Sequence, residues 1–364
     1  MSNDTKEIVN LTKDMVEFQS TKDNKEAIRK NIEYIKNYFS SKEFDITTHS
    51  YEDMPSLVIT FAKNPDDPSL MLHGHIDVVE AKKELFKVRE EDGKIYGRGT
   101  GDMKAGVACL MKAMENMKED KPDIGLMIVS DEEVGGFNGA KKLFEEHYNP
   151  GFAISAEPNN LDGYMDIITN QKGILQLKIE TEGKTAHGSR PWKGENAAEK
   201  LWEKYQEEIK PLFKDTDNGN KWETTCNLGK FNSGESTNKV PGKAEAYLDI
   251  RTTSSYPNRE VIKDIENISG ISVEVILDEP MLNTSRKNNH VNELQKTAKE
   301  IFKNCKLRRK EPGSDMRHLT RQNIPAVVFG PEGYNSHGPK EHSVTRSFED
   351  YAMTIEKFAK TSFN

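Results

Sequence analysis

Apolar residues form two kinds of pattern along the first part of the chain, a helical period and short continuous runs. In residues 3–18 and 24–42 they return every three or four positions, which is the period of an amphipathic helix. Residues 103–117 and 139–147 also read as helices. Four short apolar runs of the kind that form strands buried on both faces lie among these segments: 56–62, 70–77, 124–130 and 152–158. Buried strands separated by helices predict an α/β fold with a central, mostly parallel sheet flanked by helices.

The middle of the chain shows a different order of predicted elements. Its segments read as strand, helix, strand, strand, helix and strand, in the order 174–183, 196–213, 222–234, 243–253, 258–269 and 271–280. This β-α-β-β-α-β order is that of a ferredoxin-like domain. The alternation of helices and buried strands then resumes with a helix over 290–304, a strand over 326–331 and a helix over 347–360.

The length of 364 residues also favours two domains, because a single hydrophobic core rarely grows to that size. We predict a catalytic domain formed by residues 1–170 and 281–364. Residues 171–280 are expected to form a smaller domain inserted into it.

Composition narrows the classes of partner. The formal net charge is −8 and no long basic run is present, so a nucleic-acid partner has no electrostatic support. The first 18 residues are charged and lack the apolar core of a signal peptide. No stretch approaches the ~20 apolar residues that span a membrane. We therefore expect a cytoplasmic protein that binds neither nucleic acid nor membrane.

The three cysteines, Cys109, Cys226 and Cys305, lie far apart and show no CxxC spacing. This pattern suggests neither a thiolate metal site nor a disulfide framework. A metal ion would have to be held by histidines and carboxylates.

Residues of the metal-ligand type stand at or just beyond the carboxyl ends of the predicted strands, where α/β enzymes keep their sites. His75 and Asp77 in HGHID are two apart on a strand and face the same way, so Asp77 can accept a hydrogen bond from the ring of a metal-bound His75. His73 lies deeper in the strand and is expected to be a packed structural histidine. Asp102 in GRGTGDMK precedes a helix, where an N-cap is the simpler interpretation if it is taken alone.

The remaining candidates are also weak when taken singly. Glu132 and Glu133 close a buried strand, where unpaired carboxylates would be costly; if one binds a cation, the other can act as a base. Glu157 ends another strand, and His337 lies in a loop rich in glycine and proline. Together with His75 and Asp102, however, they match the needs of a hydrolytic site with two metal ions bridged by a carboxylate.

Five motifs then identify a resemblance. HGHIDVV, GRGTGDMKAG, SDEEVGG, AEP and HGPKE occur in the order found in the dinuclear zinc amidohydrolase and peptidase family. That family includes acetylornithine deacetylase, succinyl-diaminopimelate desuccinylase, aminoacylase and the bacterial glutamate carboxypeptidase. The resemblance covers about residues 70–345, including the inserted domain.

The resemblance implies a ligand set of two histidines and three carboxylates. One metal ion would be held by His75, Asp102 and Glu157, and the other by Asp102, Glu133 and His337, so that Asp102 bridges them. Zinc is the expected metal, although cobalt or manganese fits similar ligands.

The resemblance also assigns the neighbours of the ligands. Glu132 would be the general base and later the proton donor to the leaving amine, and Asp77 would orient His75. The peptide bond between Asp102 and Met103 would be cis.

In the inserted domain, GKTAHGSRP resembles the segment whose histidine, here His187, reaches into the active site of a partner subunit. STNKVP and YLDIR resemble the segments that supply substrate contacts, here Asn238 and Arg251. GSDMR stands where the family has a substrate loop, which makes Arg317 a second candidate contact for a carboxylate. For both arginines, the alternative is an ordinary surface ion pair. Because the His187 segment of the family reaches a partner subunit, the resemblance also implies a homodimer.

The expected reaction is hydrolysis of the amide bond of an N-acyl amino acid, of the acetylornithine or succinyl-diaminopimelate type. A di- or tripeptidase or a carboxypeptidase of the same family is the main alternative. A binding homologue without catalysis would be expected to lose the base or a ligand, and none is missing.

The late motif reads HGPKEH where the family usually has His-x-x-Asn-Glu, so Lys340 and His342 are expected to alter the pocket rim.

Overall fold

The structure is a computed structural model that describes residues 2–40, 42, 44–158, 164–213 and 221–364. The chain divides into two compact units, each described by itself below. Unit 1 contains residues 1–170, 282–309 and 314–364, and unit 2 contains residues 171–281 and 310–313.

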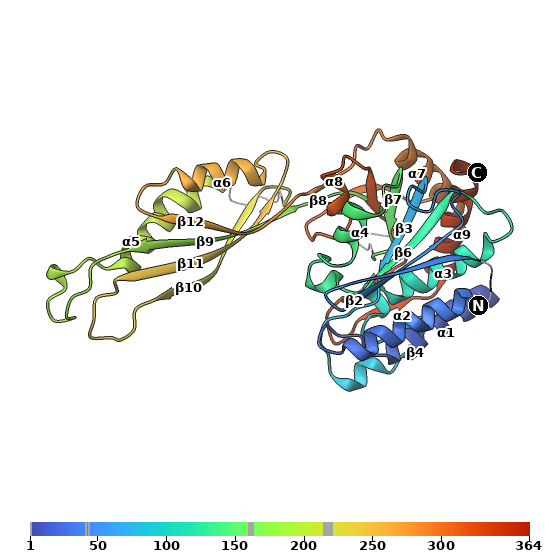
Figure 1. The fold of residues 1–364 in the computed structure, drawn as a ribbon, viewed down its shortest axis with the longest axis horizontal. Coiled ribbons are helices and arrows are strands. Elements are labelled where there is room, and N and C mark those ends of the chain that lie inside the picture. The colour runs from blue at the N-terminus through green and yellow to red at the C-terminus, as the bar shows by residue number, and fades with distance from the viewer. Residues whose placement is uncertain (1, 41, 43, 159–163, 214–220) are drawn as a thin grey trace. The chain divides into compact units, whose positions relative to one another are not determined.

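Unit 1 is built around a nine-stranded sheet whose central strands are parallel (Figure 1). The sheet order is β1-β2-β6-β3-β7-β15-β8-β13, and β14 pairs with β8. β6, β3, β7 and β15 run parallel, while β2 joins β6 and β8 joins β15 in antiparallel fashion. The strands are β1 (Asp45–Tyr51), β2 (Met54–Thr60), β3 (Leu70–His75), β6 (Ile124–Val129), β7 (Phe152–Ser155), β8 (Ile167–Gln171), β13 (Leu282–Asn283), β14 (Leu307–Lys310) and β15 (Ala326–Val328). The predicted α/β class with a mostly parallel central sheet is confirmed.

Helices cover both faces of this sheet, which explains why every residue of β3 and β6 is buried. Successive strand residues point to opposite faces. Leu70 and Leu72 pack in one core cluster, and Met71 packs in the other. The first cluster includes residues of α1 (Asn3–Glu17), α2 (Lys25–Ser40), α3 (Ala105–Asn116), α7 (Asn289–Phe302) and α9 (Arg346–Ser362). The second includes residues of α4 (Ala140–Glu146) and α8 (Arg317–Thr320). Residue 41 of the helix predicted over 24–42 lies outside the described residues.

A second, small sheet in unit 1 was not predicted, because its strands are too short to show a period. Its order is β16-β17-β5-β4. The strands are β4 (Arg89–Glu91), β5 (Lys94–Tyr96), β16 (Gly333–Tyr334) and β17 (His342–Val344). The antiparallel pairing of β17 with β5 brings the segments that flank these strands together, although they are far apart in sequence.

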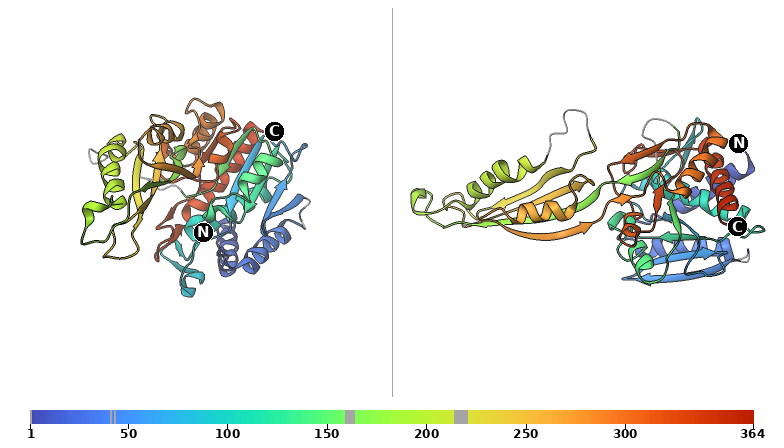
Figure 2. Two further views of the ribbon diagram at one scale, coloured as in Figure 1. Left: turned by 60° about the vertical axis from the view of Figure 1, so that its left-hand side comes forward. Right: turned by 90° about the horizontal axis from the view of Figure 1, so that it is seen from above.

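Unit 2 is a four-stranded antiparallel sheet in the order β10-β11-β9-β12. Its elements are β9 (Gly173–Glu182), α5 (Ala197–Lys204), β10 (Thr225–Ser233), β11 (Lys243–Thr252), α6 (Asn258–Glu266) and β12 (Ser272–Glu279). Alternate residues of β9 and β11 are buried in one cluster with residues of α5 and α6. The two helices lie on the same face of the sheet (Figure 2). The element order is the predicted β-α-β-β-α-β. The helix predicted over 196–213 corresponds to α5 followed directly by a π-helical segment (Tyr205–Ile209) and a 3-10 segment (Lys210–Leu212).

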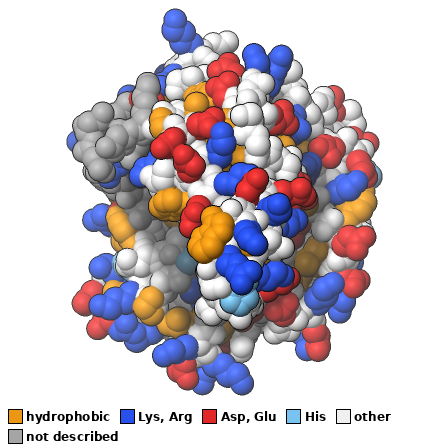
Figure 3. Space-filling model, turned by 90° about the vertical axis from the view of Figure 1, so that its left-hand side faces the viewer, with side chains coloured by type: hydrophobic (Ala, Val, Ile, Leu, Met, Phe, Trp, Pro, Cys, Tyr) orange, Lys and Arg blue, Asp and Glu red, His pale blue; other side chains and the backbone are white. Residues whose placement is uncertain are grey.

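Acidic and basic side chains are interspersed on the molecular face shown in Figure 3, with scattered apolar side chains between them. Among the described residues, no helix has both the length and the apolar character needed to cross a membrane.

Candidate metal centre

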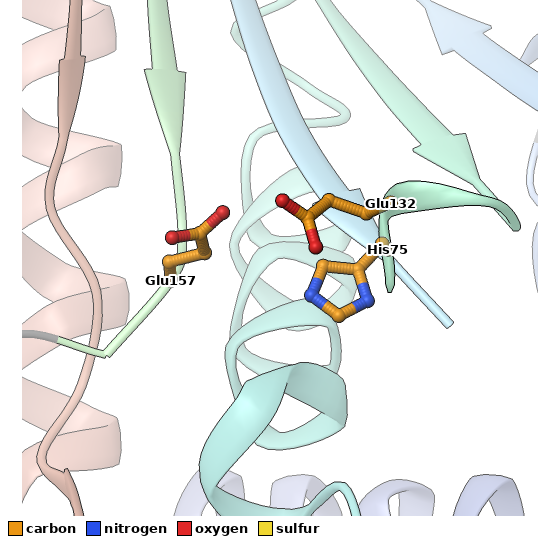
Figure 4. Close-up of side chains that lie close together, drawn as sticks. All are labelled: His75, Glu132 and Glu157. Carbon is orange, nitrogen blue, oxygen red and sulfur yellow. The ribbon is translucent and has the colours of Figure 1, made fainter. Parts of the chain in front are cut away.

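Three neighbouring parallel strands place the first residues of the site. His75 is the last residue of β3, Glu132 and Glu133 follow β6 after two residues, and Glu157 follows β7 after one. Because β6, β3 and β7 are adjacent and parallel, their carboxyl ends meet at one edge of the sheet. The side chains of His75, Glu132 and Glu157 lie around a common space there (Figure 4).

Two groups of potential ligand atoms result. The group of His75, Glu132 and Glu157 has its ligand atoms within 4.8 Å of one another, and so has the group of Asp102, Glu133 and His337.

Asp102 belongs to the second group and also lies close to the first. Its Oδ1 atom lies 3.2 Å from Nε2 of His75, and its Oδ2 atom lies 3.6 Å from Nε2 of His337. Each of its oxygens thus faces a different group, as a bridging carboxylate requires. The peptide bond between Asp102 and Met103 is cis, as the resemblance implies.

The five residues expected as ligands are therefore brought together, and Glu132 lies among them. In the geometry alone, Glu132 joins His75 and Glu157 as closely as a ligand would. Whether Glu132 acts as a ligand or as a base thus stays a prediction.

Asp77 is buried behind His75 and links it to the turn after β6. Nδ1 of His75 lies 3.0 Å from the backbone carbonyl oxygen of Asp77 and 3.4 Å from its Oδ1 atom. The same carboxylate accepts hydrogen bonds from the backbone N–H groups of Glu132, at 3.2 Å, and Glu133, at 2.9 Å. Asp77 can therefore position His75 and both glutamates at once.

The electrostatics of the site favour divalent cations. Burial and the nearby Glu157 carboxylate raise the pKa of Glu132 well above its usual value. The hydrogen bond with Glu133 raises the pKa of His337. Uncompensated carboxylates crowded in a buried place are costly, and two dications would offset their charge. Carboxylates and imidazoles without thiolates are also a donor set that suits zinc and similar divalent metals, so the residues fit a dinuclear centre.

Unit 2 carries three of the remaining predicted site residues, at two places. His187 is exposed, and its Nδ1 lies 2.8 Å from Oγ of Ser189. Asn238 is adjacent, because its carbonyl accepts the N–H of Gly188 at 2.7 Å. Arg251 lies near the opposite end of the sheet and pairs with Asp249, with N–O distances of 2.8 and 3.1 Å.

Arg317, in unit 1, is 4% exposed. Its Nη2 donates to the carbonyl of Gly135 at 2.6 Å, just after the pair of glutamates. Its neighbour Asp315 is fully buried, with Oδ2 3.4 Å from Nε2 of His73. The role of Arg317 as a substrate contact stays a prediction.

Sequence reasoning missed two residues that lie beside the candidate ligands. Arg98 and Glu341 form a buried ion pair beside Asp102 and His337. Both stand inside motifs that were noted, GRGTGDMKAG and HGPKE, so the motifs were the available signal. Their mutual contact, across 243 positions, carried no signal in a single sequence.

The fold and the site together define an α/β protein with groups of potential metal ligands gathered near the carboxyl ends of its parallel strands. Comparison with known proteins agrees. Residues 71–361 match the family described as peptidase family M20/M25/M40, and the chain belongs to this family. It is an enzyme, a metal-dependent hydrolase whose substrate is a small molecule or a peptide.

Similar proteins span more than one activity. The chain is 30% identical to a succinyl-diaminopimelate desuccinylase from Rickettsia rickettsii, over 71% of this chain and 72% of that protein. Among solved structures it resembles the aminopeptidase PepT from Bacillus cereus, with a TM-score of 0.80, 20% identity and 98% of each chain covered. It also resembles a tripeptidase from Staphylococcus aureus, with a TM-score of 0.79, 21% identity and 98% of each chain covered. These structural likenesses show the fold.

Proposed function

We propose that this enzyme hydrolyses the amide bond of an N-acyl amino acid, using two divalent metal ions that are most simply zinc. The position of Asp102 between His75 and His337, with one oxygen toward each, carries the proposal. Such a shared carboxylate is what a pair of ions ~3.5–4 Å apart needs.

The residues of the chain would divide the work. When bound, the two ions would polarise the scissile carbonyl and lower the pKa of the attacking water. Glu132 would take a proton from that water and later deliver it to the departing nitrogen, which leaves as an amine while the acyl group leaves as a carboxylate. Asp77 would hold the ring of His75.

Unit 2 would supply contacts to the substrate. His187 would donate a hydrogen bond to the oxyanion that develops from the carbonyl. Arg251 presents a planar fork that suits a substrate carboxylate, although the substrate would have to compete with Asp249 for it. We further propose that the enzyme is a homodimer joined through unit 2, so that His187 serves the site of the partner. A cytoplasmic location stays a prediction.

The acyl-amino-acid substrate is favoured by the 30% identity with a desuccinylase. The test is a hydrolysis screen on protein loaded with Zn²⁺, and in parallel with Co²⁺ or Mn²⁺. The substrates are N-succinyl and N-acetyl amino acids, dipeptides and tripeptides. We expect the highest kcat/KM for an N-acyl amino acid. Preference for a free amino terminus would instead make the enzyme a di- or tripeptidase, and no hydrolysis of any amide by protein that has bound two metal ions would overturn the proposal.

A further inference from the structure

We propose that Arg98 and Glu341 are positioning residues that hold Asp102 and His337 at the spacing required by the metal ions. Neither side chain belongs to the two groups of potential ligands. The inference rests on the proposed function, because it concerns the same metal centre.

Glu341 forms hydrogen bonds with the backbone of the loop that contains Asp102. Its Oε1 atom accepts three backbone N–H groups, from Gly99 at 2.9 Å, Gly101 at 3.1 Å and Asp102 at 3.0 Å. The side chain is 1% exposed, so water does not compete for these hydrogen bonds. One carboxylate oxygen therefore sets the path of the backbone up to and including the bridging residue.

Arg98 connects Glu341 to the backbone of the other candidate ligand, His337. One end of its guanidinium pairs with Oε2 of Glu341, and Nη2 donates to the carbonyl of His337 at 2.8 Å. Arg98 is 3% exposed. The planar fork of arginine can make both contacts at once, which the single ammonium of a lysine cannot do with the same geometry.

The small sheet explains how these residues meet. β17 pairs with β5 in antiparallel fashion, so Glu341, just before β17, lies beside the residues that follow β5. The N–H of Gly97 donates to the carbonyl of Glu341 at 3.1 Å, which continues this pairing. Ser343 adds a hydrogen bond to the carbonyl of Thr100 at 2.6 Å. The sheet thus aligns the two loops, and the buried ion pair fastens them.

His337 has particular need of such support. Its side chain is 51% exposed, and its backbone has a φ of +64°, in the left-handed region that non-glycine residues seldom adopt. Asp102, by contrast, is held by the core of unit 1 through the following helix α3. The hydrogen bond from Arg98 to the His337 carbonyl is therefore a direct tie between an exposed ligand and the buried loop of Asp102.

The test uses two variants of the full chain, Glu341→Gln and Arg98→Lys. In Glu341→Gln, the amide oxygen can still accept the three backbone N–H groups, but the amide NH₂ faces the guanidinium and the ion pair is lost. Arg98→Lys keeps the charge and loses the fork. Binding of Zn²⁺ alone is measured by competition with a chromophoric chelator, on protein whose fold is verified by circular dichroism.

We expect the wild type to bind two equivalents of Zn²⁺. In each variant one equivalent, that of the group containing His337, should bind about 10- to 100-fold more weakly, which is the usual effect of removing a partner that orients a ligand. Asp166→Asn is the matched control. Asp166 is also buried, accepts a backbone N–H, from Lys306 at 2.8 Å, and pairs with an arginine, Arg308, at 3.1 Å, but it belongs to neither group of ligands. It should lower the melting temperature without changing Zn²⁺ affinity.

The inference is overturned if both folded variants bind two equivalents of Zn²⁺ within twofold of the wild-type affinities, whatever happens to their melting temperatures. If one variant does not fold, the other decides. A wild-type protein that binds no second Zn²⁺ would instead overturn the proposed function itself, and the positioning role with it.

Discussion

At the scale of single residues, Glu132 is the most informative position. It neighbours the expected ligand Glu133 in sequence, yet its carboxylate lies beside His75 and Glu157. If Glu132 is the base and not a ligand, Glu132→Ala should keep both metal ions while kcat falls by about 10³-fold or more, because the proton transfers lose their carrier. Metal content by atomic absorption and steady-state kinetics check this.

Glu133→Ala is the matched comparison, since it removes the adjacent carboxylate. It should lose metal as well as activity. Loss of metal from the Glu132 variant would make Glu132 a ligand, and near-normal turnover with metal retained would mean that another residue is the base.

The same scale shows what a single sequence can predict about the site. His75, the Glu132–Glu133 pair and Glu157 became candidates because each lies at or just beyond the end of a buried strand, and strand ends can be predicted from local apolar runs. The assignment of Glu133 as a ligand and Glu132 as the base came from the family resemblance. Glu341 could not be given a role in this way, because its hydrogen bonds go to backbone groups about 240 positions earlier in the chain. Contacts of that range depend on tertiary structure and leave no local pattern.

At the scale of elements, α3 illustrates how packing overrides propensity. Gly106 lies in this helix, where alanine would be favoured by about 1 kcal/mol. A Cβ atom at Gly106, however, would lie 2.4 Å from the backbone carbonyl oxygen of Ala156, which cannot move without shifting the end of β7. Overpacking of this kind costs about 1–3 kcal/mol, so the clash should win. Gly106→Ala is therefore expected to lower the urea midpoint of unfolding. Because Glu157 follows Ala156, the variant should also bind Zn²⁺ more weakly. A more stable variant with unchanged Zn²⁺ binding would contradict this.

The contacts between α2, α3 and the residues after α2 predict a dependence on pH. Burial opposes ionisation of Glu115, but hydrogen bonds from Lys42, Tyr38 and Lys112 outweigh it and lower the pKa of Glu115 from its ordinary value of 4.5 to about 2. A depressed carboxyl pKa stabilises the fold fully above pH 4.5, and this contribution is lost as the pH falls toward 2. After allowance for the partial exposure of the side chain, we expect Glu115→Gln to lose about 1 kcal/mol at pH 7. Urea unfolding at several pH values should show this difference shrinking between pH 4.5 and 2, and a difference that grows in acid would contradict the assignment.

Elements differ in how far the sequence reveals them. Most helices show a helical period and most buried strands are continuous apolar runs, and these elements were predicted to within a few residues at most ends. The buried strand β8 (Ile167–Gln171) was not predicted. β1 was missed because it is a polar and largely exposed strand, DITTHSY, and the two- and three-residue strands of the small sheet are too short to carry a pattern. It is this unpredicted sheet that brings the loops of Asp102 and His337 together.

At the scale of the whole molecule, unit 2 separates two residues that are expected to act on the substrate. Arg251 pairs with Ile174, near the point where the chain enters the unit, whereas His187 follows the opposite end of β9, where Glu182 pairs with Lys243. Arg251 and Lys243 are eight positions apart along β11, roughly 26 Å at about 3.3 Å per residue. Such a separation is too large for both residues of one chain to contact a single small substrate. It favours a site that receives Arg251 from one subunit and His187 from the other.

The last prediction follows from this separation. β12 is an edge strand of the unit 2 sheet, and Val275 and Ile276 on it are 42% and 48% exposed, which favours pairing with a second copy. We predict a two-fold dimer in solution whose interface is formed by residues 171–280, to be measured by analytical ultracentrifugation. His187→Ala and Glu132→Ala should each be nearly inactive alone. After subunit exchange, a mixed dimer contains one site with an intact Glu132 and an incoming His187.

Equal mixing would give about half mixed dimers with one working site of two, and hence about a quarter of wild-type activity. Exchange is verified by mass-tagged subunits, and a mixture of Glu132→Ala with Glu133→Ala, in which no site has both residues intact, is the control. Verified exchange without recovered activity, or a fully active monomer, would show that His187 does not act across the interface. Recovery in the first mixture alone would show that a complete active site requires two chains.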